Sequence, residues 1–181
     1  MGEREDHDLV EALAGRDLSA LSDLYDRYGR IAYTLAYRIL GEPEGAEDVV
    51  QDAFLSAWRG AGTFKRERGN ARSWLLSIVH HRAVDILRRK TAFRPAPLEA
   101  AGETAADTDT AEEAARNVEG GTVRAVLATL PEAQRRTIEL AYFGGYTQSE
   151  LAGLMGVPLG TVKGRMRIGL QKMRRVLELA R

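Results

Sequence analysis

The stretch from Tyr146 to Leu177 constrains the fold more than any other part of this 181-residue chain. It opens with Thr147-Gln148-Ser149-Glu150, a capping box in which the Thr and Glu side chains each accept from the other residue's backbone N–H. Gly156-Val157-Pro158 follows, where Gly suits a left-handed helix cap and Pro suits the first turn of a new helix. The sequence therefore predicts two helices joined by a short corner, the first from Thr147 and the second from about Leu159 to about Leu179.

The two predicted helices differ in the surfaces that they present. The first is expected to bury Leu151, Leu154 and Met155. The second has apolar residues at helical spacing on one face, namely Val162, Met166, Leu170, Met173 and Leu177. Its other face carries six cations: Lys163, Arg165, Arg167, Lys172, Arg174 and Arg175. This arrangement is typical of a helix-turn-helix whose second helix enters the DNA major groove. A solvated basic face on an ordinary helical hairpin is the alternative.

The zero net charge of the chain conceals four blocks of alternating sign. Residues 1–56 hold 5 basic and 13 acidic side chains, and residues 57–90 hold 9 and 2. Residues 91–120 hold 2 and 7, and residues 121–181 hold 10 and 4. Two basic blocks separated by acidic sequence indicate two places that contact nucleic acid and an acidic surface that contacts a basic partner.

Composition excludes several functional classes. The chain has no Cys and only three His residues, so we expect no disulfide, no thiolate zinc site and no His-rich metal cage. It shows no nucleophile motif, phosphate-binding loop or carboxylate pair, which argues against an enzyme and against a cofactor. The acidic N-terminus lacks the pattern of a signal peptide, and no apolar run is long enough to span a bilayer. A soluble cytoplasmic protein without direct membrane insertion is expected.

Apolar periodicity predicts an all-α protein made of two small helical domains, and no segment has a convincing strand pattern. An N-terminal helical bundle should occupy residues 1–92, with helices over 6–14, 17–40, 43–58 and 71–90. In the second of these helices Tyr25 belongs to the expected apolar face, and in the third Phe54 does. Residues 93–120 are rich in Ala, Thr, Asp, Glu and Pro and should form an acidic flexible linker. Residues 121–181 should form a four-helix domain that ends in the helix-turn-helix.

Three segments together resemble the bacterial RNA polymerase sigma factors of the extracytoplasmic-function (ECF) group, in the sigma-70 superfamily. They are AEDVVQDAFLSAWR (46–59), SWLLSIVHHRAVDILRRK (73–90) and LPEAQRRTIELAYFGGYTQSELAGLMGVPLGTVKGRMR (130–167). The segments occur in the family's order and spacing. The third alone is also similar to the DNA-binding domain of LuxR-type response regulators. The resemblance implies a promoter-specificity subunit in which residues 1–92 are region 2-like and residues 121–181 are region 4-like.

This resemblance implies a polymerase-binding surface on the third helix, which would contact the β′ clamp helices of core RNA polymerase. The residues that would carry it are Glu47, Asp48, Gln51, Asp52, Phe54 and Leu55. A solvated acidic helix is the alternative. The resemblance also implies contact with the polymerase β flap and inhibition by an anti-sigma factor.

For the −10 promoter element, the resemblance implicates the loop 60–70 and the helix after it, which would hold an opened strand on a basic surface. The candidates are Phe64, Lys65, Arg66, Arg68, Asn70, His80, His81, Arg82, Asp85, Arg88 and Arg89. Trp74 could stack on a base, but a Trp within an apolar helical stripe is more often a core residue, which is the role expected here. Many relatives carry Arg-Asn where this chain has His80-His81, which leaves the base preference open. His81 and Asp85 share a helix face and could begin a metal site, but no third ligand is visible.

For the −35 element, the resemblance implicates the second helix of the helix-turn-helix. The candidates are Pro158, Gly160, Thr161, Lys163, Gly164, Arg165, Arg167, Arg174 and Arg175. Relatives usually have Ser or Thr at the position of Gly164, so either the DNA backbone comes close there or one contact is lost. Two other functions are compatible with the sequence: a stand-alone helix-turn-helix regulator, and a sigma-like decoy in a partner-switching pathway.

Overall fold

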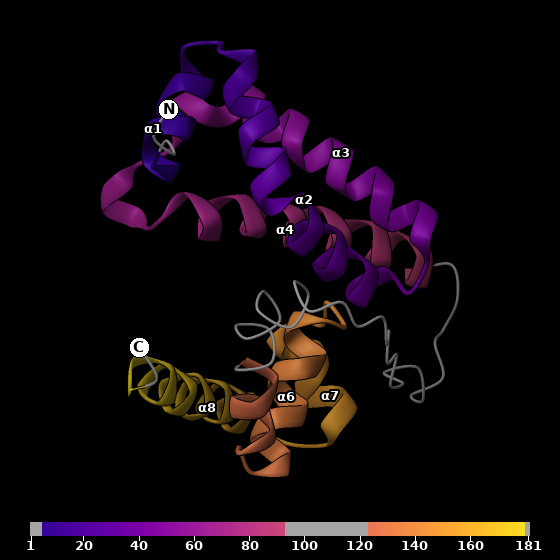
Figure 1. Ribbon diagram of the computed structural model, residues 1–181. Coiled ribbons are helices and arrows are strands. Elements are labelled where there is room, and N and C mark those ends of the chain that lie inside the picture. Colours follow the sequence, from indigo (N-terminus) through magenta and orange to yellow (C-terminus); the bar gives the residue numbers. More distant parts are fainter. Residues whose placement is uncertain (1–4, 93–122, 180–181) are drawn as a thin grey trace. The chain divides into compact units, whose positions relative to one another are not determined.

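The computed structural model describes residues 5–92 and 123–179, and every regular element within these two ranges is a helix (Figure 1). The chain divides into two compact units, with the division after Ala96. The all-α fold with two helical domains is therefore confirmed. The predicted acidic linker lies outside the described residues, and each unit is considered separately below.

The first unit contains four α-helices: α1 (Asp6–Ala14), α2 (Leu18–Leu40), α3 (Pro43–Gly60) and α4 (Ala71–Ala92). Two 3₁₀ turns, η1 (Ala61–Thr63) and η2 (Arg66–Arg68), connect α3 to α4. Asp17 caps α2 by accepting from the Ser19 N–H at 2.9 Å, and Gly41 ends that helix with a φ of 73°. Pro43 begins α3, where its missing N–H removes no helical hydrogen bond. The predicted helix limits agree with these bounds to within two residues.

Small side chains allow α2, α3 and α4 to pack closely. Alanines with almost no exposed surface include Ala32 and Ala36 on α2, Ala46, Ala53 and Ala57 on α3, and Ala83 on α4. The exception to the predicted pattern is Tyr25, which is 51% exposed. The nearby Leu24 and Tyr28 are buried. The inward face of α2 passes through Leu24 and Tyr28, and Tyr25 lies on its flank.

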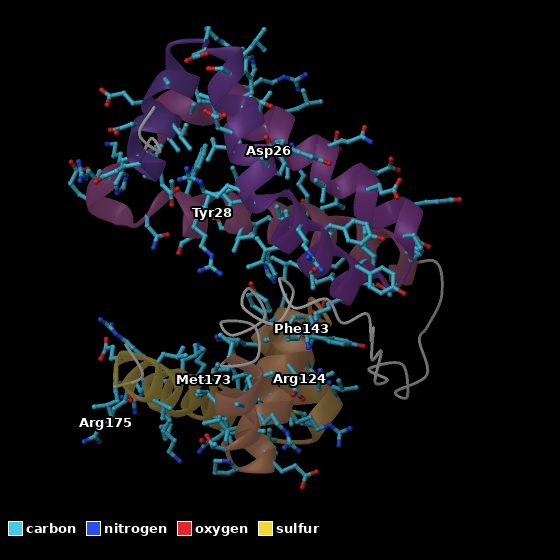
Figure 2. All side chains as sticks on the ribbon, in the orientation of Figure 1. Asp26, Tyr28, Arg124, Phe143, Met173 and Arg175 are labelled. Atoms are coloured by element: carbon cyan, nitrogen blue, oxygen red, sulfur yellow. The ribbon has the colours of Figure 1, made fainter. Side chains whose placement is uncertain are left out.

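The helix α1 is fixed to α2 at its first residue. The Asp6 carboxylate pairs with Arg27 and accepts a hydrogen bond from the hydroxyl of Tyr28, which Figure 2 labels. Burial and this hydrogen bond raise the pKa of Tyr28 to about 12, so the hydroxyl stays protonated and donates at neutral pH. Leu9, Val10 and Leu13 complete the attachment with almost no exposed surface.

The second unit contains α6 (Glu132–Tyr142), α7 (Gln148–Met155) and α8 (Leu159–Leu179), and residues 123–128 are also helical. The predicted capping box is present at Thr147, and Gly156 caps α7 with a φ of 62°. Leu127, Leu130 and Ile138 form a core against which Met173 packs, on the side of α8 that Figure 2 shows facing α6. Leu151 of α7 and Val162 of α8 are fully buried.

Two residues predicted to be buried in the helix-turn-helix are exposed: Leu154 at 37% and Leu170 at 49%. The buried stripe of α8 passes from Val162 through Gly169 to the half-buried Met173. Gly169 therefore occupies the inward position beside Leu170. A Cβ on Gly169 would lie 2.6 Å from the Ile138 Cδ1, which explains why a glycine allows α8 to approach α6.

Two glycines of α8 should respond in opposite ways to replacement by alanine. Gly169→Ala should destabilise the second unit by up to about 1 kcal/mol, because the shift of the Ile138 Cδ1 within a packed core outweighs the helix preference of alanine. Gly164→Ala should instead stabilise α8 by up to about 1 kcal/mol, because nothing lies within 4 Å of its added Cβ and alanine favours helix. Thermal or denaturant unfolding of the full chain measures both. Equal shifts for the two variants would contradict this packing.

Candidate nucleic-acid interfaces

The exposed side of α8 carries the strongest cationic surface of the second unit. Lys163 and Arg167 are exposed near its start, and Arg165 is half-buried. Lys172 and Arg175 continue this surface toward the C-terminus, where Figure 2 shows Arg175 projecting from the helix. Arg174 pairs with Glu178 at 2.7 Å, so its charge is partly neutralised within the helix. The half nearest α7 therefore offers the better site for an anionic ligand.

The first two turns of α8 have little side-chain bulk on the outward side. Gly160 and Gly164 are four residues apart and so lie on one helix face. Nothing lies within 4 Å of a Cβ built on either residue. Thr161 and Pro158 are exposed beside them. A nucleic acid can thus approach the helix backbone closely between Lys163, Arg165 and Arg167.

The orientation of α8 relative to α7 is fixed by contacts that the sequence did not reveal. The Gln148 Nε2 donates to the Met166 Sδ at 3.5 Å, and the Thr137 Oγ1, which donates to the Ala133 carbonyl at 2.6 Å, lies 3.7 Å from the Met155 Sδ. These contacts join α7 to α8 and to α6, respectively. Met166 and Met155 were predicted only as apolar packing residues, since side-chain hydrogen bonds to sulfur leave no sequence pattern.

The exposed side of α3 is acidic. Glu47, Asp48, Gln51 and Asp52 are exposed on it, and the apolar Leu55 is exposed beside them. Phe54 is different from the rest of the predicted set because it is only 4% exposed. It lies on the buried face of α3 with Val50 and Ala57, and its ring meets the Tyr25 ring edge-on at 5.0 Å. The prediction of Phe54 as a direct surface contact is corrected: it supports this surface from beneath.

An open hollow between α2 and α3 extends the acidic side of α3. It is lined by Tyr25, Asp26, Gly29, Arg30, Tyr33, Glu47, Val50 and Gln51. Gly29 leaves room for the Tyr25 ring, which lies 3.4 Å from the position of a Cβ there. Sequence reasoning missed this feature because Tyr25 was assigned to the apolar core.

The connection between α3 and α4 holds the predicted basic loop. Lys65, Arg66 and Asn70 are exposed, and Arg68 lies in η2. Asn70 also has a structural role, because its Oδ1 accepts from the Ser73 N–H at 2.7 Å at the start of α4. Phe64 is half-buried, with its ring 5.4 Å from the ring of the half-buried Trp74.

The candidate residues of α4 lie in different environments. His81, Asp85 and Arg88 are exposed and share one helix face by their spacing, with Arg89 beside them. His80 is half-buried, and its ring meets the His81 ring edge-on at 5.7 Å. Arg82 donates to the Ser56 Oγ at 3.0 Å, which ties α4 to α3.

No group of three His, Cys, Asp or Glu side chains in residues 5–92 or 123–179 could hold a metal ion. In the same ranges, no helix combines the length and apolar character needed to cross a membrane.

Family models match both units. The model described as Sigma-70 region 2 matches residues 24–93, and the model described as Sigma-70, region 4 matches residues 126–175. The first match includes α3, the basic loop and α4, and the second includes α6, α7 and most of α8.

Similar proteins cover almost the whole chain. The ECF RNA polymerase sigma factor SigK of Mycobacterium tuberculosis is 33% identical over 95% of this chain and 93% of its own length. SigK of Mycolicibacterium vanbaalenii is 32% identical over 95% of this chain and 89% of its own length. Among solved structures, Rhodobacter sphaeroides SigE in complex with the anti-sigma ChrR is 29% identical, with a TM-score of 0.49 and coverage of 96% and 99%.

The helix-turn-helix, the separate basic surfaces and the acidic α3 agree with these sequence matches to both sigma-70 regions. The chain therefore belongs to the extracytoplasmic-function group of RNA polymerase sigma factors, which direct promoter-specific initiation of transcription.

Proposed function

We propose that this sigma factor divides its work among three surfaces. The exposed residues of α3 and the adjoining hollow bind core RNA polymerase, the basic loop and α4 hold the opened −10 element, and α8 reads the −35 element as duplex. The observation that carries this proposal is the separation of charge by surface: acidic side chains cover α3, whereas cations cover the start of α8. Only the two basic surfaces attract the phosphate backbone.

For the −10 element, the supporting features are exposed cations next to aromatic rings. Lys65 and Arg66 directly follow Phe64, and His81, Arg88 and Arg89 are exposed on α4. Single strands are held by cations along the backbone and by stacking of bases on aromatic side chains. Opening a duplex costs stacking and pairing energy, which such a surface offsets by binding the displaced strand.

For the −35 element, support comes from the placement of α8 in the helix-turn-helix. Recognition helices of this motif contact base edges with residues near their N-terminus. Arg165 and Arg167 lie in that part of α8, together with the bare backbone at Gly160 and Gly164. Arg175 lies further along, where contact with phosphates fits its position better.

The proposed partners follow from these surfaces. The acidic α3 suits the β′ clamp helices of core RNA polymerase, and the second unit suits the β flap together with promoter DNA. An anti-sigma factor that covers either surface would hold the protein inactive. The sigma factor would work in the cytoplasm, where polymerase and DNA are, and would catalyse no reaction of its own.

Transcription with purified components tests the proposal as a whole. The sigma factor and core RNA polymerase should together give promoter-dependent transcripts that neither gives alone. Failure to bind core polymerase combined with tight binding to duplex DNA would indicate a stand-alone regulator. Binding to an anti-sigma factor without transcripts would indicate a sigma-like decoy.

Charge reversal on α3 should weaken the polymerase complex. Asp48→Lys combined with Asp52→Lys should reduce affinity for core polymerase by about tenfold or more, because both carboxylates would face basic residues. The matched control is Glu11→Lys with Asp23→Lys, which changes the net charge equally at exposed positions on α1 and α2. Fluorescence anisotropy of labelled sigma factor measures both. Equal affinities for the two double variants would show that Asp48 and Asp52 are not part of the interface.

Removing a cation from the start of α8 should impair the use of the −35 element. Arg165→Ala or Arg167→Ala should cost about 1–3 kcal/mol if the side chain reads a base. If the side chain contacts a phosphate, fewer counterions are released on binding. The slope of log affinity against log salt concentration should then decrease in magnitude by about one. Arg124→Ala, at an exposed position that Figure 2 labels away from α8, is the control. Holoenzyme binding to promoters with intact and altered −35 elements distinguishes these effects. If the affinity changes with neither promoter, the residue does not contact the −35 element.

Gly164→Ala should separate stability from DNA binding. The added methyl group has open space in the free protein, so the helix gains stability. If DNA approaches the backbone of α8 at this point, the same methyl group must hinder it. Affinity for the −35 duplex should therefore fall although the melting temperature rises. Unchanged affinity would show that DNA does not come close to Gly164.

A further inference from the structure

Three aromatic rings in series connect α1, the basic loop and α4. The His7 ring lies 5.7 Å from the Phe64 ring, at an interplanar angle of 31°. Phe64 in turn lies 5.4 Å from Trp74, at an angle of 57°. Figure 1 shows α1 beside the turn that leads from α3 toward α4. The loop that carries Lys65 and Arg66 is thus held between two helices by a single phenylalanine ring.

The basic loop has few other attachments. Between Gly62 and Asn70, Phe64 is half-buried and the other residues whose side chains are described are exposed. The backbone hydrogen bonds there are local, such as the Phe64 N–H to the Ala61 carbonyl at 3.0 Å and the Gly69 N–H to the Arg66 carbonyl at 3.3 Å. The ends of the loop are attached by the buried Ala61 and by Asn70, whose Oδ1 accepts from the Ser73 N–H of α4 at 2.7 Å. Between these two ends, the ring contacts of Phe64 restrain the segment that carries the loop cations.

On the other side of Phe64, α1 provides a rigid support. Asp6, which precedes His7, is bound by Arg27 and Tyr28 of α2. Leu9, Val10 and Leu13 are at most 1% exposed. The backbone that carries His7 is therefore held by contacts on both sides of it in the sequence. The region 2 model starts at residue 24, after α1 ends, so the family match gives this helix no role.

We infer that His7 is a positioning residue for promoter opening: its ring holds Phe64, and through Phe64 it sets the position of Lys65 and Arg66 against the −10 strand. This inference rests on the proposed role of the basic loop. It adds α1, a helix with no cation in the predicted DNA-binding set, to the machinery that opens the promoter. His7 acts through Phe64 and contacts no DNA itself.

The buried nitrogen of His7 provides a way to identify what the ring does. The His7 Nδ1 is buried and has no hydrogen-bond partner among the described residues. A phenyl ring at this position would keep the packing on Phe64 and would remove a buried polar atom that lacks a partner. His7→Phe should therefore preserve the position of the loop, whereas His7→Ala should release it.

The test uses holoenzyme on a promoter with 2-aminopurine in the −10 element, whose fluorescence rises when the base unstacks. His7→Ala should reduce the equilibrium for opening by about 2- to 10-fold, the range expected for loss of one aromatic pair. Affinity for core polymerase and for the −35 duplex should equal that of the wild type. His7→Phe should open the promoter as the wild type does. Asp8→Ala, at an exposed neighbouring position on α1, is the matched control and should have no effect.

The outcomes distinguish this inference from the proposed function. If wild-type holoenzyme gives no fluorescence change, the proposed role of the loop fails. If the wild type opens the promoter and His7→Ala opens it equally well, the positioning role of His7 is overturned. Loss with both His7→Ala and His7→Phe would also overturn it, because ring packing would not be the cause. Parallel losses of core affinity and of thermal stability in His7→Ala would point to a general effect on folding and would overturn it as well.

Discussion

Burial of one face of each helix is the interaction on which the other features of this sigma factor depend. In the first unit, alanines of α2 and α3 let the helices approach closely, which fixes the carboxylates of α3 on the outer side. In the second unit, Val162 and Gly169 are buried against the core, which leaves the opposite side of α8 exposed. Each exposed surface then carries largely one sign of charge. Packing thus determines which partner, a basic protein or an anionic nucleic acid, each surface can bind.

Local signals made most of the fold predictable. The capping box at Thr147 and the left-handed Gly156 each depend on a few adjacent residues, and the structure contains both. Errors arose where two neighbouring residues compete for one inward position. Gly169, not Leu170, faces the core, because the clearance from Ile138 depends on a distant helix. Tyr25 shows the same limit, since its place on the flank of α2 involves a ring contact with Phe54 of another helix.

The candidate surfaces were predictable as patterns of charge but not as contacts. Pairing of Arg82 with Ser56, of Gln148 with Met166 and of His7 with Phe64 joins residues that are far apart in the sequence. No periodicity encodes such pairs. The departures at Gly164 and at His80-His81 were visible from the resemblance alone. The structure adds that Gly164 faces open space and that the two His rings touch each other, one half-buried and one exposed.

We propose that two separate surfaces of one chain contact two promoter elements in the same complex. Site-specific photocrosslinking in the holoenzyme–promoter complex tests it most directly, with the probe placed at position 66 or at position 167. A probe at position 66 should label the −10 element, and a probe at position 167 should label the −35 element. Labelling of one and the same element from both positions, or of neither element from either position, would contradict the account.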